Sequence, residues 1–273
     1  MTPLPRARKR FGQHFLEPAW VAKLLASLSA APDDRFLEIG PGRGALTIPL
    51  ASRVARLIAV EIDSDLVAFL RSRLPSSARI VEGDFLDADL DHLLRDERKP
   101  LRVVGNLPYN VSSPILFKLL HAAAEGRTLA DATVMLQKEV ADRLIAAPGS
   151  SDYGTLAVQV ALLADVERVL TLPPGAFRPP PKVTSAVVRM RFRHAREDVG
   201  DLATFERLVR GVFLQRRKKL LNALEPVAAT FGQSAADVIA AAGVDGSRRP
   251  GELTLQDIAR LSRSCAIVLP RTR

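Results

Sequence analysis

The chain has 273 residues, of which 47% are hydrophobic, and its formal net charge is +9. This length and composition allow a large buried core in one large domain, or in one large and one small domain. No apolar run approaches the roughly 20 residues that cross a bilayer, and the first residues lack the apolar centre of a signal peptide, so we expect a cytoplasmic protein without a membrane partner. A single cysteine, Cys265, excludes an internal disulfide, and only 4 histidines make a metal site unexpected.

Short runs rich in β-branched residues alternate with helical patterns between residues 35 and 192. The expected strands cover residues 36–39, 56–62, 79–83, 102–106, 132–137, 166–172 and 185–192. This alternation predicts an α/β fold, in which a mostly parallel sheet carries helices on both faces. The proline-rich stretch at residues 172–183 predicts a loop, because proline neither donates to a strand ladder nor continues a helix.

The strand pattern stops at about residue 195, and helical patterns follow at residues 201–224, 234–243 and 253–262. We therefore expect a large domain over residues 1–194 and a small all-α domain over residues 195–273. No apolar helix is left over for a partner chain, so we expect a monomer.

The positive charge gathers near the two ends of the sequence. Residues 191–273 hold 15 Lys and Arg residues against 9 Asp and Glu residues, a net charge of +6. The densest clusters are Arg216, Arg217, Lys218 and Lys219, and Arg6, Arg8, Lys9 and Arg10. Either cluster alone is equally typical of a solvated helix face, but two clusters beside one enzyme-like core favour a nucleic-acid partner.

The sequence FLEIGPGRGALT, at residues 36–47, contains the first strand of the expected core and a glycine-rich turn directly after it. Glycine lets the backbone approach a ligand closely, and the start of a following helix offers unpaired N–H groups to anionic ligands. Gly40, Gly42 and Ala45 also satisfy the G-x-G-x-x-G/A pattern of nicotinamide dehydrogenases. The turn therefore predicts a nucleotide-type pocket, with a plain strand-to-helix turn as the alternative.

Two acidic residues follow at the ends of the next two strands. Glu61 lies 21 positions after Gly40, where a carboxylate accepts hydrogen bonds from the ribose of NAD or of S-adenosylmethionine. Asp84 ends the third strand, where it either accepts from an adenine amino group or caps the next helix. Because ligands of open α/β sheets bind at the carboxyl ends of the strands, these positions predict one shared site.

The fourth strand ends in the sequence Asn106, Leu107, Pro108 and Tyr109. Pro108 fixes its own φ angle and makes Leu107 extended, so the loop is stiff. Asn106 then offers its side-chain oxygen, Leu107 its carbonyl, and Tyr109 a flat face for a base. Two acceptors that hold the N–H groups of an exocyclic amine favour a pyramidal nitrogen whose lone pair is available to attack a methyl sulfonium. Taken alone, this motif is equally compatible with a purely structural turn.

In this order, the motifs resemble the KsgA-type small-subunit ribosomal RNA adenine dimethyltransferases. The resemblance is carried by RKRFGQHFL (8–16), LEIGPGRGALT (37–47), AVEIDSDL (59–66), VEGDFLD (81–87), VVGNLPYNVSSPI (103–115), MLQKEVADRL (135–144), YGTLAVQ (153–159), FRPPPKVTSAVVR (177–189) and FLQRRKKLLNAL (213–224). It implies a Rossmann-like class I methyltransferase sheet followed by a small helical domain. It also implies transfer of methyl groups from S-adenosylmethionine to N6 of two adjacent adenosines near the 3′ end of 16S ribosomal RNA in the immature 30S subunit.

The resemblance assigns roles to individual residues. The expected cofactor-binding residues are His14, Leu16, Gly40, Gly42, Glu61, Ile62, Asp84, Phe85 and Asn106. The expected catalytic residues are Asn106, Leu107, Pro108, Tyr109 and Phe177, with Tyr109 and Phe177 stacking on the two faces of the target adenine. The expected RNA-binding residues are Arg8, Lys9, Arg10, Lys182, Arg216, Arg217, Lys218 and Lys219. Without the resemblance, Phe177 is predicted to be a core residue, since most aromatic side chains are.

One position departs from the family pattern. This chain has His14 where the family most often has asparagine. Histidine still donates a hydrogen bond, so the resemblance implies that the contact with the methionine carboxylate of the cofactor survives.

Three other functions are compatible with parts of the sequence. The first is methylation of an adenine in 23S ribosomal RNA, as in the related antibiotic-resistance enzymes, which share the cofactor loop and the asparagine motif. The second is a binding role in ribosome assembly, which is compatible with the enzymatic one. The third, a nicotinamide dehydrogenase, leaves residues 106–109 and the basic clusters without a role. Methyl transfer to an amine requires neither a metal nor a covalent enzyme intermediate.

Overall fold

The computed structural model describes residues 13–97 and 99–266, and the chain forms two compact units. Unit 1 comprises Met1–Ala141 and Asp165–Phe192, and unit 2 comprises Asp142–Ala164 and Arg193–Arg273. The domain boundary that the sequence predicts at residue 194 stays a prediction, and in the structure residues 142–164 group with unit 2. These residues group with unit 2 because helix α7 (Thr155–Leu163) packs against helices α8 (Leu202–Leu214) and α11 (Leu255–Ala266).

Unit 1 is built on a seven-stranded sheet with the order β4-β3-β2-β5-β6-β9-β7. Its strands are β2 (Arg35–Ile39), β3 (Arg56–Glu61), β4 (Ala78–Glu82), β5 (Leu101–Asn106), β6 (Leu129–Gln137), β7 (Ala164–Leu172) and β9 (Ser185–Phe192). The pairs β3–β4, β2–β3, β2–β5 and β5–β6 are parallel, and β6–β9 is antiparallel. All seven expected strands are therefore present in the described part of the chain, and the α/β prediction is confirmed.

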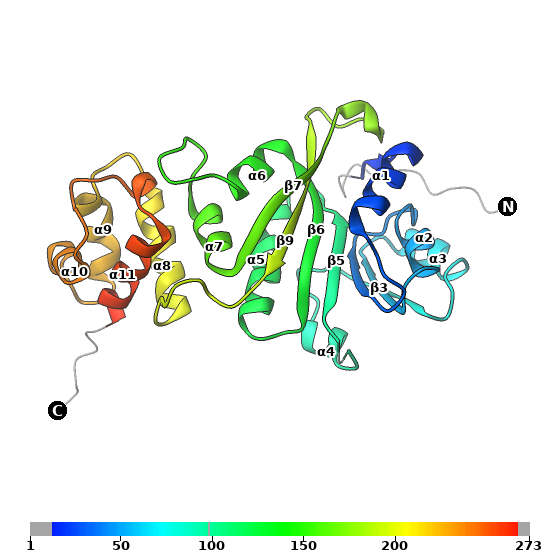
Figure 1. The fold of residues 1–273 in the computed structure, drawn as a ribbon, viewed down its shortest axis with the longest axis horizontal. Coiled ribbons are helices and arrows are strands. Elements are labelled where there is room, and N and C mark those ends of the chain that lie inside the picture. Colours follow the sequence, from blue (N-terminus) through cyan, green and yellow to red (C-terminus); the bar gives the residue numbers. More distant parts are fainter. Residues whose placement is uncertain (1–12, 98, 267–273) are drawn as a thin grey trace. The chain divides into compact units, whose positions relative to one another are not determined.

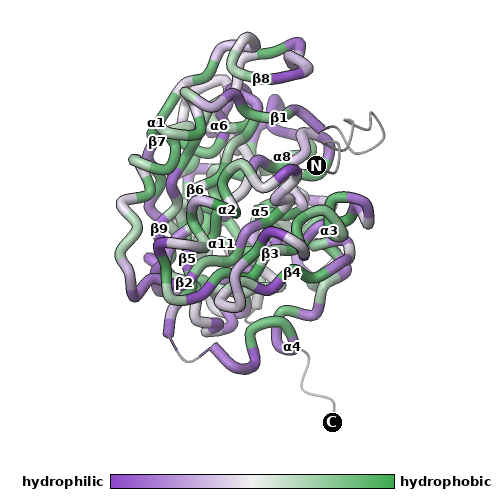
Figure 2. The backbone as a smooth tube through the Cα atoms, turned by 90° about the vertical axis from the view of Figure 1, so that its right-hand side faces the viewer, coloured by the Kyte–Doolittle hydropathy of each residue, from purple (hydrophilic) through white to green (hydrophobic). Residues whose placement is uncertain are grey.

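Helices connect the parallel strands and cover both faces of the sheet (Figure 1). The connecting helices are α2 (Thr47–Ala51), α3 (Ser64–Arg71), α4 (Leu90–Leu94) and α5 (Ser112–Ala124), while α1 (Pro18–Leu28) precedes β2 and α6 (Lys138–Leu144) follows β6. The central strands β2 and β3 are buried almost along their whole length, which explains why their sequences are continuous apolar runs and do not alternate. In Figure 2, hydrophobic segments follow the strands, and hydrophilic residues lie mostly in the connections.

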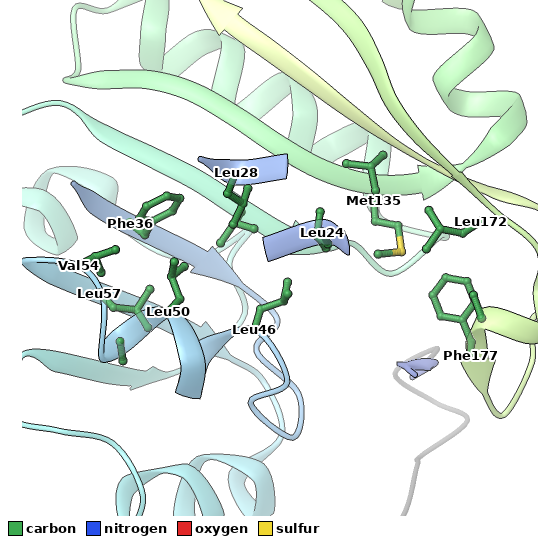
Figure 3. Packing of buried hydrophobic residues seen from close by; sticks show 14 residues of the cluster. Leu24, Leu28, Phe36, Leu46, Leu50, Val54, Leu57, Met135, Leu172 and Phe177 are labelled. Atoms are coloured by element: carbon green, nitrogen blue, oxygen red, sulfur yellow. The ribbon is translucent and has the colours of Figure 1, made fainter. Parts of the chain in front are cut away.

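The core on one face of the sheet joins α1 and α2 to the central strands. Leu24 and Leu28 from α1 and Leu50 from α2 are buried together with Phe36 of β2 (Figure 3). This apolar layer fixes the positions of the carboxyl ends of β2 and β5. Those strand ends carry the motifs expected to bind a ligand.

A second, two-stranded sheet ties the start of the described chain to the proline-rich loop. Strand β1 (Phe15–Leu16) pairs antiparallel with β8 (Phe177–Arg178), with Leu16 opposite Phe177. The short helix η2 (Pro174–Ala176) lies directly before β8. Residues 172–183 thus form a loop as expected, except for this helical turn and short strand.

Unit 2 is helical apart from its connections. Besides α7, α8 and α11 it contains α9 (Leu220–Ala229), α10 (Ala235–Ala242) and the short helix η3 (Pro250–Glu252). Asp201 and Ser234 cap the starts of α8 and α10, as their sequences indicate. Helices α8 and α9 approach closely at Gly211, where an added Cβ atom would meet Val227 at 2.9 Å. Within the described residues, no helix has the length and apolar character that a membrane span requires.

Candidate active site

A pocket lies in unit 1 at the carboxyl ends of the parallel strands. It is lined by every expected residue from four of the motifs and from the segment before α1, namely His14, Leu16, Gly40, Gly42, Glu61, Ile62, Asp84, Phe85, Asn106, Leu107, Pro108 and Tyr109. These residues come from positions up to 95 apart in the sequence, and the sheet brings them together because its parallel strands all end at one edge.

The glycine-rich turn forms the floor of this pocket after β2. Gly40 and Gly42 have φ angles of +68° and +59°, in the left-handed region that favours glycine. A Cβ atom at Gly42 would meet the ring of Phe15 at 3.2 Å, so the turn also needs glycine for space. The expected helix follows the turn as α2, which begins at Thr47 and has 5 residues, and the N–H of Ile48 already donates to the carbonyl of Gly44 at 3.0 Å.

Glu61 connects this turn to the end of β3. Its carboxylate accepts hydrogen bonds from the N–H of Gly42 at 2.9 Å and from the N–H of Asp63 at 3.0 Å. The side chain is 5% exposed. Burial raises the pKa of the Glu61 carboxyl, and the two backbone N–H groups lower it in part. A carboxylate oriented in this way keeps further lone pairs with which to accept the hydroxyls of a ribose.

Asp84 lies in the loop after β4, and hydrogen bonds from the backbone and from Lys118 hold this loop in place. Its carboxylate accepts from the N–H of Leu86 at 2.8 Å. The ammonium group of Lys118 on α5 donates to the carbonyls of Leu86, at 2.7 Å, and Ala88, at 2.5 Å. The alternative that Asp84 caps the next helix is wrong, because the cap of α4 is Asp89. Lys118 was missed from sequence, where it is a single charged residue in the apolar helix SSPILFKLLHAAA.

Asn106 ends β5, and its amide is anchored on one side. The Nδ2 group donates to the backbone carbonyl of His14 at 2.8 Å. The backbone of the following loop is tied to the sheet, because the N–H of Leu107 donates to the carbonyl of Met135 at 3.1 Å. The Asn106 amide oxygen is therefore the atom of this side chain that remains to accept from a ligand.

Tyr109 is half-buried at the end of the same loop. Its hydroxyl forms a hydrogen bond of 2.6 Å with the hydroxyl of Ser185 on β9. Burial raises the pKa of the Tyr109 phenol, and the contact with Ser185 lowers it in part. The ring is stacked on the ring of His14, with centroids 5.9 Å apart and an angle of 21° between the planes.

Phe177 does not line the pocket. Its side chain is 0% exposed and belongs to the core, where Figure 3 shows it beside Met135 and Leu172. The structure thus agrees with the prediction from sequence alone that Phe177 is a core residue. A base would reach this ring only after Phe177 had left the core, so the stacking role implied by the resemblance stays a prediction.

Glu38 is a pocket residue that the sequence analysis missed. It lies in the buried strand β2, is 1% exposed, and its Oε2 atom has no hydrogen-bond partner. Burial, with a smaller contribution from the charge of Glu61, raises the pKa of this carboxyl to about 8, and the hydroxyl of Thr47 lowers it in part. The available signal was an acidic residue inside an otherwise apolar strand, directly before the glycine-rich turn.

The expected RNA-binding residues are distributed over both units. Lys182 is exposed in unit 1, in the loop after β8. The cluster of Arg216, Arg217, Lys218 and Lys219 is exposed in unit 2, in the turn between α8 and α9. Arg8, Lys9 and Arg10 lie outside the described residues. Among the residues that the structure does describe, no group of three or more His, Cys, Asp or Glu side chains is placed to hold a metal ion.

Comparison with known proteins identifies the family. The profile of the family "Ribosomal RNA adenine dimethylase" matches residues 5–266. The chain is 45% identical over 261 residues to "Ribosomal RNA small subunit methyltransferase A" of Pseudomonas syringae pv. tomato, covering 94% of both chains. It is 45% identical over 266 residues to the protein of the same name from Geobacter metallireducens, covering 95% of both.

Solved structures agree with this result. A dimethyladenosine transferase from Plasmodium falciparum has a TM-score of 0.74 and 26% identity, covering 91% of this chain and 96% of that one. The 23S ribosomal RNA methyltransferase ErmE has a TM-score of 0.61 and 25% identity, covering 92% and 99%. The sheet with its pocket at the strand ends, the order of the motifs and the match over nearly the whole sequence lead to one conclusion: the chain belongs to the ribosomal RNA adenine dimethylase family.

Proposed function

We propose that the protein transfers methyl groups from S-adenosylmethionine to N6 of two adjacent adenosines near the 3′ end of 16S ribosomal RNA in the immature 30S subunit. The observation that carries the proposal is the anchored amide of Asn106. Its Nδ2 group is engaged with the carbonyl of His14, which leaves the oxygen in the pocket to accept from an amine. The 45% identity with proteins named for the small subunit favours that subunit over the large one.

The side chains of the pocket fit S-adenosylmethionine. The acceptors of the pocket include the unpartnered Oε2 of Glu38 and the remaining lone pairs of Glu61 and Asp84. These groups suit the hydroxyls, the amines and the positive charge of such a cofactor. Ile62 and Phe85 add apolar surface for an adenine ring. When bound, S-adenosylmethionine supplies an electrophilic methyl group on a positively charged sulfur.

The residues of the chain act on the amine that receives the methyl group. The Asn106 oxygen and the Leu107 carbonyl accept the two N–H groups of the adenine amine, and Tyr109 supports the base through its ring. Accepting both N–H groups directs the nitrogen lone pair away from the loop. The fixed loop thus contributes orientation and electrostatics, and it needs no covalent bond to the substrate.

The test is methylation of purified ribosomal subunits. Small and large subunits that lack dimethyladenosine are incubated separately with the protein and S-adenosylmethionine, and the RNA is analysed by mass spectrometry. We expect two adjacent dimethylated adenosines in the small subunit, and Asn106→Ala to slow transfer by about 100- to 1000-fold, as for loss of one group that stabilises a transition state. Modification of the large subunit alone would contradict the choice of substrate, and an unimpaired Asn106→Ala variant would remove this residue from the mechanism.

We further propose that the protein acts as a monomer in the cytoplasm and also binds the immature subunit as an assembly factor. The exposed basic cluster between α8 and α9 supports RNA binding, because phosphate contacts dominate such affinity. The Asn106→Ala variant separates the two roles. It should still bind immature small subunits, with an affinity that falls as salt is added, and a variant without methyl transfer that also fails to bind would argue against the second role.

A further inference from the structure

Two hydrogen bonds link the proline-rich loop to the catalytic asparagine through residue 14. The Nδ1 atom of His14 lies 2.8 Å from the carbonyl oxygen of Pro179. The backbone carbonyl of the same residue lies 2.8 Å from Nδ2 of Asn106. His14 thus contacts the loop with its side chain and the active site with its backbone.

The chemistry of the partners fixes which atoms donate. A carbonyl oxygen accepts hydrogen bonds and cannot donate, so Nδ1 of His14 must carry a proton towards Pro179. For the same reason, Asn106 must turn its NH₂ group to the carbonyl of His14. The amide oxygen of Asn106 is then left for the substrate. If the amide rotated by half a turn, its NH₂ group would face the N–H groups of the target amine, and no hydrogen bond could form.

The backbone of residue 14 is held in place by its neighbours. Phe15 and Leu16 pair with Arg178 and Phe177 in the two-stranded sheet. The N–H of Glu17 donates to the carbonyl of Ala176 at 2.9 Å. The contact between His14 and Pro179 extends this ladder by one side-chain bond, beyond the pair Phe15 and Arg178.

The arrangement also accounts for the departure from the family pattern at this position. In histidine the Nδ1 atom is bonded to Cγ, and in asparagine the Nδ2 atom is bonded to Cγ as well. Either side chain can therefore offer an N–H group at the same distance along the chain from Cα. The imidazole ring adds stacking on Tyr109, but the shared feature is the donor.

We propose that His14 is a positioning residue, whose Nδ1–H bond to Pro179 holds its own carbonyl where it orients the amide of Asn106. The inference rests on the proposed methyl transfer to an adenine amine. It differs from the cofactor contact expected for His14, because it predicts an effect on the rate of transfer at saturating cofactor. It also gives the proline-rich loop a connection to the reacting group that does not require Phe177 to leave the core.

Three variants separate the donor from the ring. His14→Asn keeps an N–H donor and loses the ring, His14→Phe keeps a ring and loses the donor, and His14→Ala loses both. We expect His14→Asn to keep kcat within about 3-fold, and the other two to lower kcat by about 10- to 100-fold, as for a slight misplacement of a catalytic group. The KM for S-adenosylmethionine should change little in all three.

The alternatives give different results. Loss of activity in His14→Asn with normal kcat in His14→Phe would show that the ring matters, and would overturn the proposal. A raised KM with unchanged kcat would assign His14 to the cofactor, and would overturn it equally. Transfer by the wild-type protein is measured first on the same small subunits, so failure of the proposed function itself is recognised separately.

Nuclear magnetic resonance tests the proposal without activity. In ¹⁵N-labelled wild-type protein, which has 4 histidines, the signal of His14 is assigned by its absence from His14→Asn. We expect the neutral imidazole of His14 to carry its proton on Nδ1. A neutral ring that carries the proton on Nε2 would contradict the bond to Pro179, even if His14→Phe failed to fold.

Discussion

At the amino end of the parallel strands arginines pair with the carboxylates, whereas at the carboxyl end backbone N–H groups hold them. At the amino end, Glu97 accepts ion pairs from Arg35 and Arg56, which begin β2 and β3. Nearby, Arg102 of β5 pairs with Asp34 at 2.8 Å and with Asp131 at 3.1 Å. These pairs join neighbouring strands.

At the carboxyl end, Glu61 and Asp84 accept from the N–H groups of nearby residues, and Glu38 has an oxygen without a partner. Backbone N–H groups orient a carboxylate but do not neutralise it as an arginine does. Desolvation raises the pKa values of Glu38 and Glu61, and at the amino end it also raises that of Asp131, where the charge of Arg102 offsets it in part. The carboxylates at the amino end thus join neighbouring strands, whereas Glu38, Glu61 and Asp84 at the carboxyl end line the pocket.

We expect the largest change in stability from a substitution at the amino end of the parallel strands. Arg102→Met removes both ion pairs and a hydrogen bond to the carbonyl of Leu28, and it leaves the largely buried Asp131 without its cation. We expect the free energy of unfolding to fall by about 3–5 kcal/mol, as when one partner of a buried pair is removed. Denaturant titration measures this change, and the Kd for S-adenosylmethionine should stay within about 2-fold of the wild-type value at a temperature where both proteins are folded.

The matched control is Arg79→Met, which removes the same side chain from an exposed position on β4. It should change the free energy of unfolding by about 0.5 kcal/mol or less. Equal losses in the two variants would mean that the network around Arg102 is not what joins the strands, and the contrast between the two ends would fail.

At the carboxyl end the largest effect should be on binding. Glu61→Gln keeps the size of the side chain, but its NH₂ group cannot accept from the N–H of Asp63 or from a ribose hydroxyl. Loss of a charged hydrogen bond predicts a rise in the cofactor Kd of about 30-fold, from roughly 2 kcal/mol. Calorimetry measures the Kd, and the loss of stability should be smaller than that in Arg102→Met.

Glu82→Gln is the control for this prediction. Glu82 lies opposite Glu61 in the register of β3 and β4, also at a strand end, but its side chain is exposed. Its substitution should leave the cofactor Kd within about 2-fold, because an exposed charge contributes little. A similar rise in Kd for both variants would point to a general loss of negative charge at this edge.

The contrast also explains how much of the fold could be predicted from sequence. The strands of unit 1 were visible because buried parallel strands are continuous apolar runs. The pairing of β1 with β8 was missed, since two strands of 2 residues each, far apart in sequence, leave no local pattern. The sequence of α7, TLAVQVALL, is apolar on all sides, so it does not indicate which unit buries this helix.

The site could be predicted from sequence where a motif ends a strand and its side chain lines the pocket at that strand end. Glu61, Asp84 and Asn106 all line the pocket, because parallel strands bring their ends together. The burial of Phe177 could not be predicted from the resemblance, since burial depends on how the proline-rich loop packs against Met135 and Leu172. The bond between His14 and Pro179 joins residues 165 apart, and only the fold reveals it.

The smallest predicted effect concerns the proton on Glu38. Burial is the main reason that its pKa is about 8, so the protein without cofactor holds this carboxyl mostly neutral at pH 7. A positively charged cofactor in the pocket favours the ionised form, so binding should release a proton. We expect the affinity of the wild-type protein for S-adenosylmethionine to rise by up to about 10-fold between pH 6.5 and pH 9, and that of Glu38→Gln to rise less.

The free energy of unfolding should depend on pH with the opposite sign to the cofactor affinity, so it is an independent check on the proton of Glu38. A carboxyl whose pKa is raised in the folded state keeps a proton that the unfolded chain loses above about pH 4.5, so unfolding becomes easier as pH rises from there to about 8. Glu38→Gln lacks this component, and its stability relative to wild type should therefore improve across that range in denaturant titrations. Parallel curves for the two proteins, in binding and in unfolding, would show that Glu38 is already ionised at pH 7. Water or a shift of neighbouring groups would then have to stabilise the buried Oε2 atom of Glu38. In that case the carboxylates at both ends of the strands would be charged and stabilised, and the two ends would differ less than we expect.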